Sequence, residues 1–181
     1  MIFRNLCLLL AVGIFSGTAF GAAGPGDYYL GPEVGFAILN AGAGVHPNFG
    51  ISFGGRLTPP VLLGVFYSYI PYGSVSSTNG TSVSGSEKFY GGQLAWDFTP
   101  MITGMTLGAR AGFSSVSTQS YTTANGAFDD SSTGLAWGPL ISYERPISPD
   151  FTLGGEALVM LPSESAAPNV FELLATLKWW F

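Results

Sequence analysis

The sequence ends with FELLATLKWWF, residues 171–181, a stretch in which two kinds of position alternate. Every second residue is apolar: Phe171, Leu173, Ala175, Leu177, Trp179 and Phe181. The positions between them are mixed and include Glu172 and Lys178. Because successive side chains of a strand point to opposite faces, this pattern predicts a β-strand with two unlike environments. Large aromatic residues seldom occupy the end of a soluble chain, since termini are usually exposed and poorly ordered.

This last stretch resembles the C-terminal signature of bacterial outer-membrane β-barrels. The residues that carry the resemblance are Phe171, Leu173, Leu177, Trp179 and Phe181. It implies a final strand that the barrel-assembly machinery recognises and that closes the barrel against the first strand. The alternative is a core strand of a soluble β-sandwich.

The other end of the chain has the pattern of a targeting segment. Residues 1–5 carry one positive charge, residues 6–15 are an apolar run too short to span a bilayer, and residues 16–21 are mostly small. We therefore expect a signal peptide over residues 1–21, with Ala23 as an alternative cleavage point, and a barrel domain over residues 22–181. The single cysteine, Cys7, lies in the leader, so the mature chain should use neither disulfides nor thiolate metal ligands.

The composition excludes most other classes. Charged residues make up 9% of the chain, against about 25% in typical soluble domains, while 47% are hydrophobic. Beyond the leader there is no apolar stretch of about 20 residues, the length that a helical span needs. Helices and closed barrels are the structures that can cross a bilayer, so a barrel remains. A net charge of −5 without a basic cluster argues against nucleic acid as a partner.

Segments of strand length with alternating polarity recur along the mature chain. We expect strands over residues 28–39, 48–57, 61–70, 89–98, 105–116, 134–144, 151–161 and 171–181. The third segment is apolar on both faces, and we expect its odd-numbered residues to face outward: Val61, Leu63, Val65, Tyr67 and Tyr69. The predicted fold is all-β, an eight-stranded antiparallel up-and-down transmembrane β-barrel.

The connections alternate in length, as in outer-membrane barrels, where short turns lie on the periplasmic side. The turns after the second, fourth and sixth segments are short and contain proline. Two connections, residues 71–88 and 117–133, are long and rich in Ser, Thr and Gly, and we expect them to be exposed polar loops.

The charged residues of the strands all fall on the predicted inward faces. They are Glu33, Arg56, Asp97, Arg110, Glu144, Glu156, Glu172 and Lys178. A buried charge is tolerable only when it is paired, so we expect an ion-pair network that plugs the periplasmic half of the lumen. The expected pairs join neighbouring strands: Glu33 with Arg56, Asp97 with Arg110, and Lys178 with both Glu156 and Glu33. A charged constriction that passes ions or small solutes is the alternative.

The sequence offers little for catalysis or metal binding. Serine hydrolysis would need a histidine base beside a nucleophile, and the one histidine, His46, falls in a predicted surface loop. Asn48 stands where the lipid A deacylase family has its serine. The adjacent Asp129 and Asp130 are weak evidence for a divalent cation. We expect no catalytic site, metal or cofactor.

As a whole, the chain resembles the small outer-membrane barrels of the OmpA, OmpX and OmpW type, without the peptidoglycan-binding domain of OmpA. Interior salt bridges are a feature of OmpA-type barrels. The resemblance implies a monomer in the Gram-negative outer membrane with a structural or surface-interaction role. Its partners would be outer-membrane lipid and lipopolysaccharide, with periplasmic chaperones and the assembly machinery during biogenesis. A porin-like conduit for small solutes is the alternative, and a lipid A-modifying enzyme is less favoured.

Overall fold

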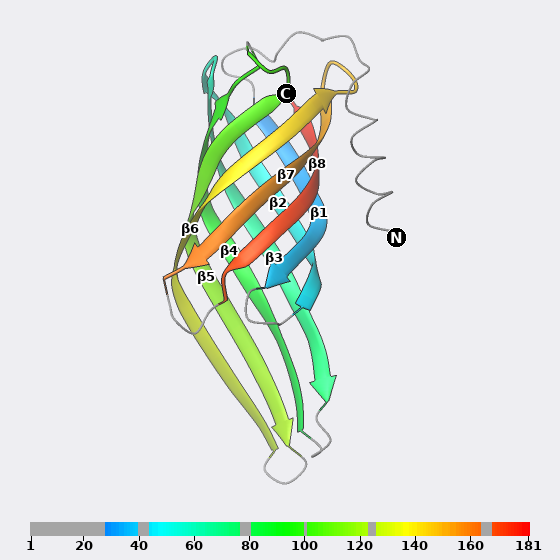
Figure 1. Cartoon of the computed structure of the whole chain (residues 1–181), viewed down its shortest axis with the longest axis vertical. Helices are drawn as coiled ribbons and strands as arrows, with labels where there is room; N and C mark the ends of the chain where they lie inside the picture. The colour runs from blue at the N-terminus through cyan, green and yellow to red at the C-terminus, as the bar shows by residue number, and fades with distance from the viewer. Residues whose placement is uncertain (1–27, 40–43, 77–80, 100, 123–125, 164–167) are drawn as a thin grey trace.

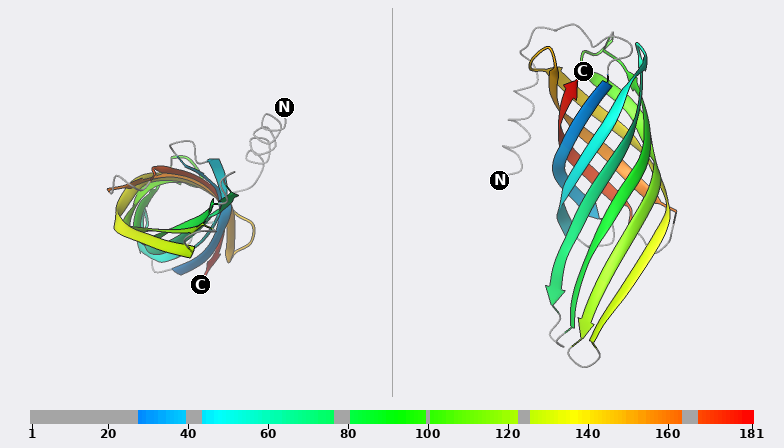
Figure 2. Two further views of the ribbon diagram at one scale, coloured as in Figure 1. Left: turned by 90° about the horizontal axis from the view of Figure 1, so that it is seen from below. Right: turned by 180° about the vertical axis from the view of Figure 1, so that it is seen from behind.

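A computed structural model gives the architecture, and it describes residues 28–39, 44–76, 81–99, 101–122, 126–163 and 168–181. Eight antiparallel strands form one closed barrel in sequence order (Figures 1 and 2). They are β1 (Tyr28–Leu39), β2 (Gly44–Thr58), β3 (Val61–Ser76), β4 (Thr81–Asp97), β5 (Met105–Thr122), β6 (Gly126–Pro146), β7 (Phe151–Pro162) and β8 (Val170–Trp180). The described residues contain no helix long and apolar enough to cross a membrane. The expected leader, residues 1–21, lies outside them.

The predicted strand count, order and orientation are confirmed. The expected short turns after β2, β4 and β6 lie together at one end of the barrel, here called the turn end, where β1 begins and β8 finishes (Figure 1). β3–β6 reach well beyond the opposite end, here called the extended end (Figure 2).

The prediction of long loops over residues 71–88 and 117–133 is wrong, because most of these residues continue the strands. β3 and β4 stay paired as far as Ser76 with Ser82, and β5 and β6 as far as Thr122 with Gly126. A period-two apolar face is needed only where a strand borders lipid or a core. Outside the part of the strand that borders lipid or a core, strands rich in Ser and Thr can continue to pair through their backbones without an apolar face.

The barrel closes where β8 returns to β1. Tyr28 and Phe181 exchange backbone hydrogen bonds, with N–O distances of 3.0 and 2.9 Å. The ladder continues to Leu39 opposite Val170, with a gap in the register beside Pro32, which has no N–H to donate. The strand at the end of the sequence therefore closes the sheet against the first strand, as the terminal signature implies.

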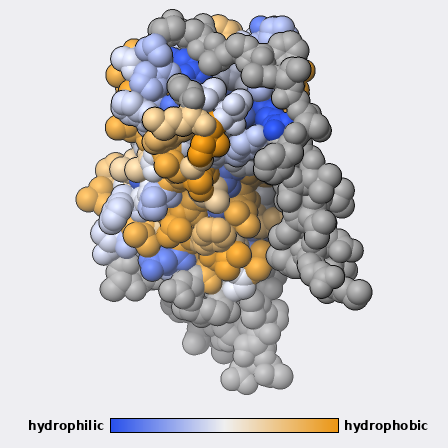
Figure 3. All heavy atoms as spheres, turned by 45° about the horizontal axis from the view of Figure 1, so that its top comes forward, coloured by the Kyte–Doolittle hydropathy of each residue, from blue (hydrophilic) through white to orange (hydrophobic). Residues whose placement is uncertain are grey.

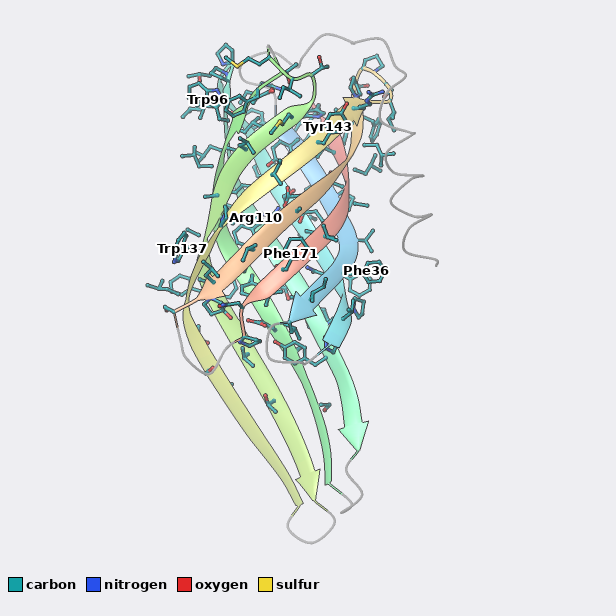
Figure 4. The ribbon with its side chains drawn as sticks, viewed as in Figure 1. Phe36, Trp96, Arg110, Trp137, Tyr143 and Phe171 are labelled. Carbon is teal, nitrogen blue, oxygen red and sulfur yellow. The ribbon has the colours of Figure 1, made fainter. Side chains whose placement is uncertain are left out.

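The outer face of the barrel is apolar. The tryptophans Trp96 and Trp137 are 51% and 58% exposed, and with Phe36 and Phe171 they point away from the barrel wall (Figure 4). Orange, apolar side chains gather on that wall in the space-filling view (Figure 3). On β3, Leu63, Val65 and Tyr67 are exposed, in agreement with the predicted facing. The even-numbered residues of this part of β3 point into the lumen.

Glycine allows neighbouring strands to approach closely. A Cβ atom on Gly112 of β5 would lie 2.1 Å from the carbonyl oxygen of Tyr90 and 2.6 Å from the Cα of Gly91. The outward-facing Gly92 differs, because a Cβ there would meet nothing closer than the Gly64 oxygen at 3.8 Å.

This contrast predicts unequal effects of alanine at the two glycines. We expect Gly112→Ala to lower the free energy of unfolding by about 1–3 kcal/mol, because the β4–β5 backbones must move apart. Gly92→Ala should stay within about 0.5 kcal/mol of the wild type. Urea denaturation of refolded protein, followed by tryptophan fluorescence, measures both. Equal midpoints for the two variants would contradict the close approach.

Candidate functional site

The eight charged residues expected inside the barrel all have their side chains almost fully buried within it. Glu33, Asp97, Arg110, Glu156, Glu172 and Lys178 are 0–6% exposed as residues. The side chains of Arg56 and Glu144 are 8% and 12% exposed. Because successive side chains of a strand point to opposite faces, the charged side chains point inward while the apolar residues between them point outward. The lumen is therefore the place to look for a functional site.

Arg110 on β5 lies at the centre of the buried charges and has no exposed surface (Figure 4). Its Nη2 is 2.9 Å from Oε1 of Glu33 and 2.6 Å from Oε1 of Glu156. Its Nε donates to Oε1 of Gln93 at 3.1 Å, and its guanidinium carbon lies 4.7 Å from the ring centre of Phe66. Glu33 belongs to β1, four strands from β5 in a ring of eight, so this ion pair spans the lumen.

Two further ion pairs lie toward the turn end. Arg56 is 2.8 Å from Oδ2 of Asp97, and it also donates to the carbonyl oxygen of Pro59 at 2.7 Å. Lys178 binds Glu144 and lies 4.7 Å from the ring centre of Tyr29. Each pair joins strands that are two apart, β2 with β4 and β6 with β8.

The predicted partners of these charges are wrong, although the residues are the right ones. None of the four expected pairs, Glu33 with Arg56, Asp97 with Arg110, or Lys178 with Glu156 or Glu33, forms a salt bridge among the described residues. The register explains this difference: Glu33 faces Gly50 on β2, whereas Arg110 faces Gln93 on β4. Neighbouring charges therefore lie at different heights, while long side chains in a narrow lumen meet across its axis.

Glu172 has no cation as a direct partner among the described residues, contrary to the expected network. Its Oε2 accepts hydrogen bonds from Nδ2 of Asn48 and, at 3.3 Å, from Oγ of Ser68. The Ser68 Oγ also lies 2.8 Å from Oδ1 of Asn48, so its single proton is shared between the two acceptors. This polar cluster links β2, β3 and β8 through hydrogen bonds.

Sequence reasoning missed a second carboxylate cluster, nearer the extended end. Glu87 is fully buried and accepts hydrogen bonds from Tyr72 and, at 2.8 Å, from Oγ of Ser114. The error follows from the wrong loop assignment. Glu87 continues the inward parity of Gln93 and Asp97 on β4, so a longer predicted strand would have included it.

The apolar filling of the lumen was also missed. Buried apolar side chains from β1, β3, β4, β6, β7 and β8 pack together around the two carboxylate clusters: Ala37, Leu39, Phe66, Ile70, Phe89, Ala136, Leu140, Leu158, Met160, Val170 and Leu174. A signal was present, because Leu140, Leu158 and Leu174 share the inward parity of the charged residues. Near the turn end the ion pairs lie beside a smaller apolar cluster of Tyr29, Leu62, Ala95 and Trp180, and mostly apolar packing fills the other half of the lumen.

His46 does not lie in a surface loop as expected. It belongs to β2, opposite Ala37 of β1, and its ring is 5.5 Å from that of Tyr72 in an edge-on contact. Asn48, two residues along, is buried in the Glu172 cluster. The expectation about Asp129 and Asp130 concerns side chains outside those that the structure describes.

An apolar outer face around a charged and tightly paired interior defines a class of protein, the transmembrane β-barrel. This polarity is the reverse of a soluble barrel, whose apolar residues face inward and whose charges face the solvent. Outward aromatic residues gather near the turn end, where Phe151 stacks on Trp179 and Trp179 contacts Phe181. Such aromatic girdles mark the interfaces of a bilayer.

Comparison with solved structures identifies the same fold in small outer-membrane barrels. The attachment invasion locus protein Ail of Yersinia pestis has a TM-score of 0.63 at 10% identity, over 87% of this chain and 99% of Ail. A major outer membrane protein of Thermus thermophilus has a TM-score of 0.64 at 11% identity, over 85% of this chain and 99% of that one. Neisserial surface protein A has a TM-score of 0.57 at 16% identity, over 86% and 99%.

No protein-family model matches the sequence, and no curated protein is significantly similar to it. At 10–16% identity the structural likeness establishes the fold, an eight-stranded transmembrane barrel.

The Arg110 contacts predict a large and specific loss of stability. Arg110→Met should lower the free energy of unfolding by about 3–5 kcal/mol, because it leaves the Glu33 and Glu156 carboxylates buried without their cation. Adding Glu33→Gln and Glu156→Gln should recover part of that loss. The matched control is Arg145→Met, an outward cation whose removal should cost less than about 1 kcal/mol. Urea denaturation of refolded protein measures all three variants, and a cost for Arg110→Met as small as that for Arg145→Met would refute the assignment.

Proposed function

We propose that this protein is an integral outer-membrane barrel with a structural or surface-interaction role and a lumen closed to solutes. The observation that carries this proposal is the arrangement of the buried charges. Arg110 and its partners join opposite walls of the barrel, and each end of the arrangement continues into further packing, ionic on one side and apolar on the other. An open aqueous pore would instead need a continuous polar path along the lumen.

The extended end supports a role in surface interaction. β3 pairs with β2 only as far as Tyr69, yet it continues to Ser76. The parts of β3–β6 that extend beyond the barrel form a four-stranded projection. On its other side, β6 begins at Gly126, while its pairing with β7 starts at Ala136. Both outer strands of the projection therefore have backbone groups without a neighbouring strand in the described part of the chain. Such edges can pair with an extended segment of another protein.

Export to the outer membrane is supported by the leader-like pattern of residues 1–21 and by the terminal strand. Phe171, Leu173, Leu177, Trp179 and Phe181 all lie on the outward face of the last strand, 36–58% exposed. They are thus available to the assembly machinery before insertion and to lipid after it. With short turns on the periplasmic side, the projection of β3–β6 would extend from the cell surface.

The closed lumen predicts an electrically silent protein. In planar bilayers, refolded wild-type protein should give no steady ion conductance, since Arg110 and the apolar packing leave no continuous aqueous path. Gly92→Ala, which alters only the outer face, should be equally silent. The porin-like alternative makes the opposite prediction: a steady, ion-selective conductance of the wild type that changes in Arg110→Ala.

The proposed orientation predicts which segments are accessible on intact cells. An epitope inserted between Asn79 and Gly80 should bind antibody without permeabilisation, because that connection joins the ends of β3 and β4 that lie farthest from the turn end. The same epitope between Ser148 and Pro149, in the turn between β6 and β7, should bind antibody only after the outer membrane has been opened. In the sequence, the two insertion points fall between β3 and β4 and between β6 and β7. Surface labelling of the second insertion, or recovery of the protein away from the outer-membrane fraction, would contradict the proposal.

A further inference from the structure

Glu87 lies at the root of the projection, where β3 loses its outer neighbour. It is paired with Ile70 of β3 and Val116 of β5, and the last pair between β3 and β2 is Tyr69 with Phe49. Ile70 is therefore the first residue of β3 beyond that pairing. Glu87 is nevertheless completely buried. A buried carboxyl group thus lies where the four-stranded projection leaves the barrel.

Hydroxyl groups are the partners of this carboxyl group. Tyr72 of β3 donates to its Oε2, and Ser114 of β5 donates to its Oε1 at 2.8 Å. No cation forms an ion pair with Glu87 in the described part of the chain, whereas Arg110 binds both Glu33 and Glu156. Burial without a cation penalises the ionised form of a carboxyl group. The three hydrogen-bonded side chains therefore join β3, β4 and β5 most firmly while Glu87 keeps its proton.

Other ionisable groups lie close to Glu87 on β2, β3 and β4. Tyr72 itself ionises only at a pH of about 10 in its ordinary state. His46 of β2 contacts the ring of Tyr72, with 5.5 Å between the ring centres. Lys88, the next residue of β4, is exposed and belongs to the opposite face. His46 is thus a second group near the root that can titrate near neutral pH, and a test must separate the two.

The remaining neighbours along the lumen are acidic. Glu172 accepts a hydrogen bond from Ser68, which faces Phe89, so the Glu172 cluster lies one inward position nearer to the turn end. Residues 129–130 of β6 are both aspartates, and they are opposite residues 118–119 of β5, farther toward the extended end. Negative charge on these groups opposes the ionisation of Glu87.

Glu172 is also buried without a cation as a direct partner, but the wall encloses it. At Glu172, β8 is paired with β1 through Ala37 and with β7 through Leu158. Glu87 lies instead beside the part of β3 that β2 does not cover. A local separation of strands at the root of the projection therefore brings water to Glu87 before Glu172.

We propose that the ionisation of Glu87 is a pH-sensitive switch at the root of the projection. The protonated carboxyl group stays buried and holds β3–β5 together through Tyr72 and Ser114. The ionised carboxylate draws water to the inner face of the root and loosens the strands there. The switch adds regulation to the proposed surface role of the projection and rests on that role for its purpose, but the pH effect is measurable without any binding partner.

The direction of the effect follows from proton linkage. In the loosened root the carboxyl group faces water and ionises with the ordinary pKa of Glu, about 4.3. The loosened form then binds fewer protons than the closed form, so its population rises with pH. The rise is at most about tenfold per pH unit, and it stops once the closed form ionises as well. The root is therefore most stable in acid and loses stability as the pH increases.

Amide hydrogen exchange of the full-length refolded barrel in nanodiscs tests the switch, because it reports local opening. Exchange of residues 70–76 and 84–89 is followed by mass spectrometry and corrected for the chemical effect of pH on exchange. Between pH 5 and 8 we expect the opening of the wild type to increase about tenfold or more. Glu87→Gln has the shape of the neutral acid and cannot ionise, so its opening should not change with pH. Glu87→Leu, which also cannot ionise, should behave in the same way and replaces the Gln variant if that does not refold.

Two matched variants separate Glu87 from the other titrating groups. His46→Gln and Glu172→Gln should both keep the pH dependence of the wild type. A wild type whose opening is independent of pH, a dependence that survives in Glu87→Gln or Glu87→Leu, or one that is lost in either matched variant would overturn the switch. Failure of the antibody experiment above would instead reject the surface location and leave the pH effect in place.

Discussion

The structure depends on the closure of one β-sheet upon itself. A strand placed against lipid has no water to satisfy its backbone polar groups, so each N–H and C=O needs a neighbouring strand. The pairing of β1 with β8, anchored by the reciprocal hydrogen bonds of Tyr28 and Phe181, removes the two edges that an open sheet would have. Because closure leaves no unpaired strand edge in the described barrel wall, the apolar outer face can border lipid.

Closure with eight strands makes the lumen narrow, and this narrowness determines its chemistry. Side chains from opposite walls reach one another, so Arg110 on β5 can bind Glu33 on β1. Where long side chains occupy the axis, small ones must line the wall beside them, as Gly112 does where its strand approaches Gly91. Buried charges are costly to desolvate, so each pair matters chiefly because loss of one partner would leave the other charge buried and unpaired.

The two ends of the barrel differ in structure. At the turn end the chain reverses within a few residues, and Gly104 adopts a φ of 83° in the turn that precedes β5. At the extended end β3–β6 continue as a projection whose sequence is rich in Ser and Thr. The contents of the lumen also differ between the two ends. Ion pairs lie near the turns, whereas apolar packing, interrupted by Glu87 and Glu172, lies toward the projection.

The sequence by itself determined the strand number, the outward faces and every described lumen charge except Glu87. Those features follow from the two-residue period, which is local and can be read along a single strand, as in residues 171–181. The tertiary structure alone decided which charges meet, because Arg110 selects Glu33 and Glu156 through strand stagger and lumen width rather than through strand order. It also decided that β3–β6 extend beyond the barrel and bury Glu87, since a polar strand gains its stability from a paired neighbour and not from its own pattern.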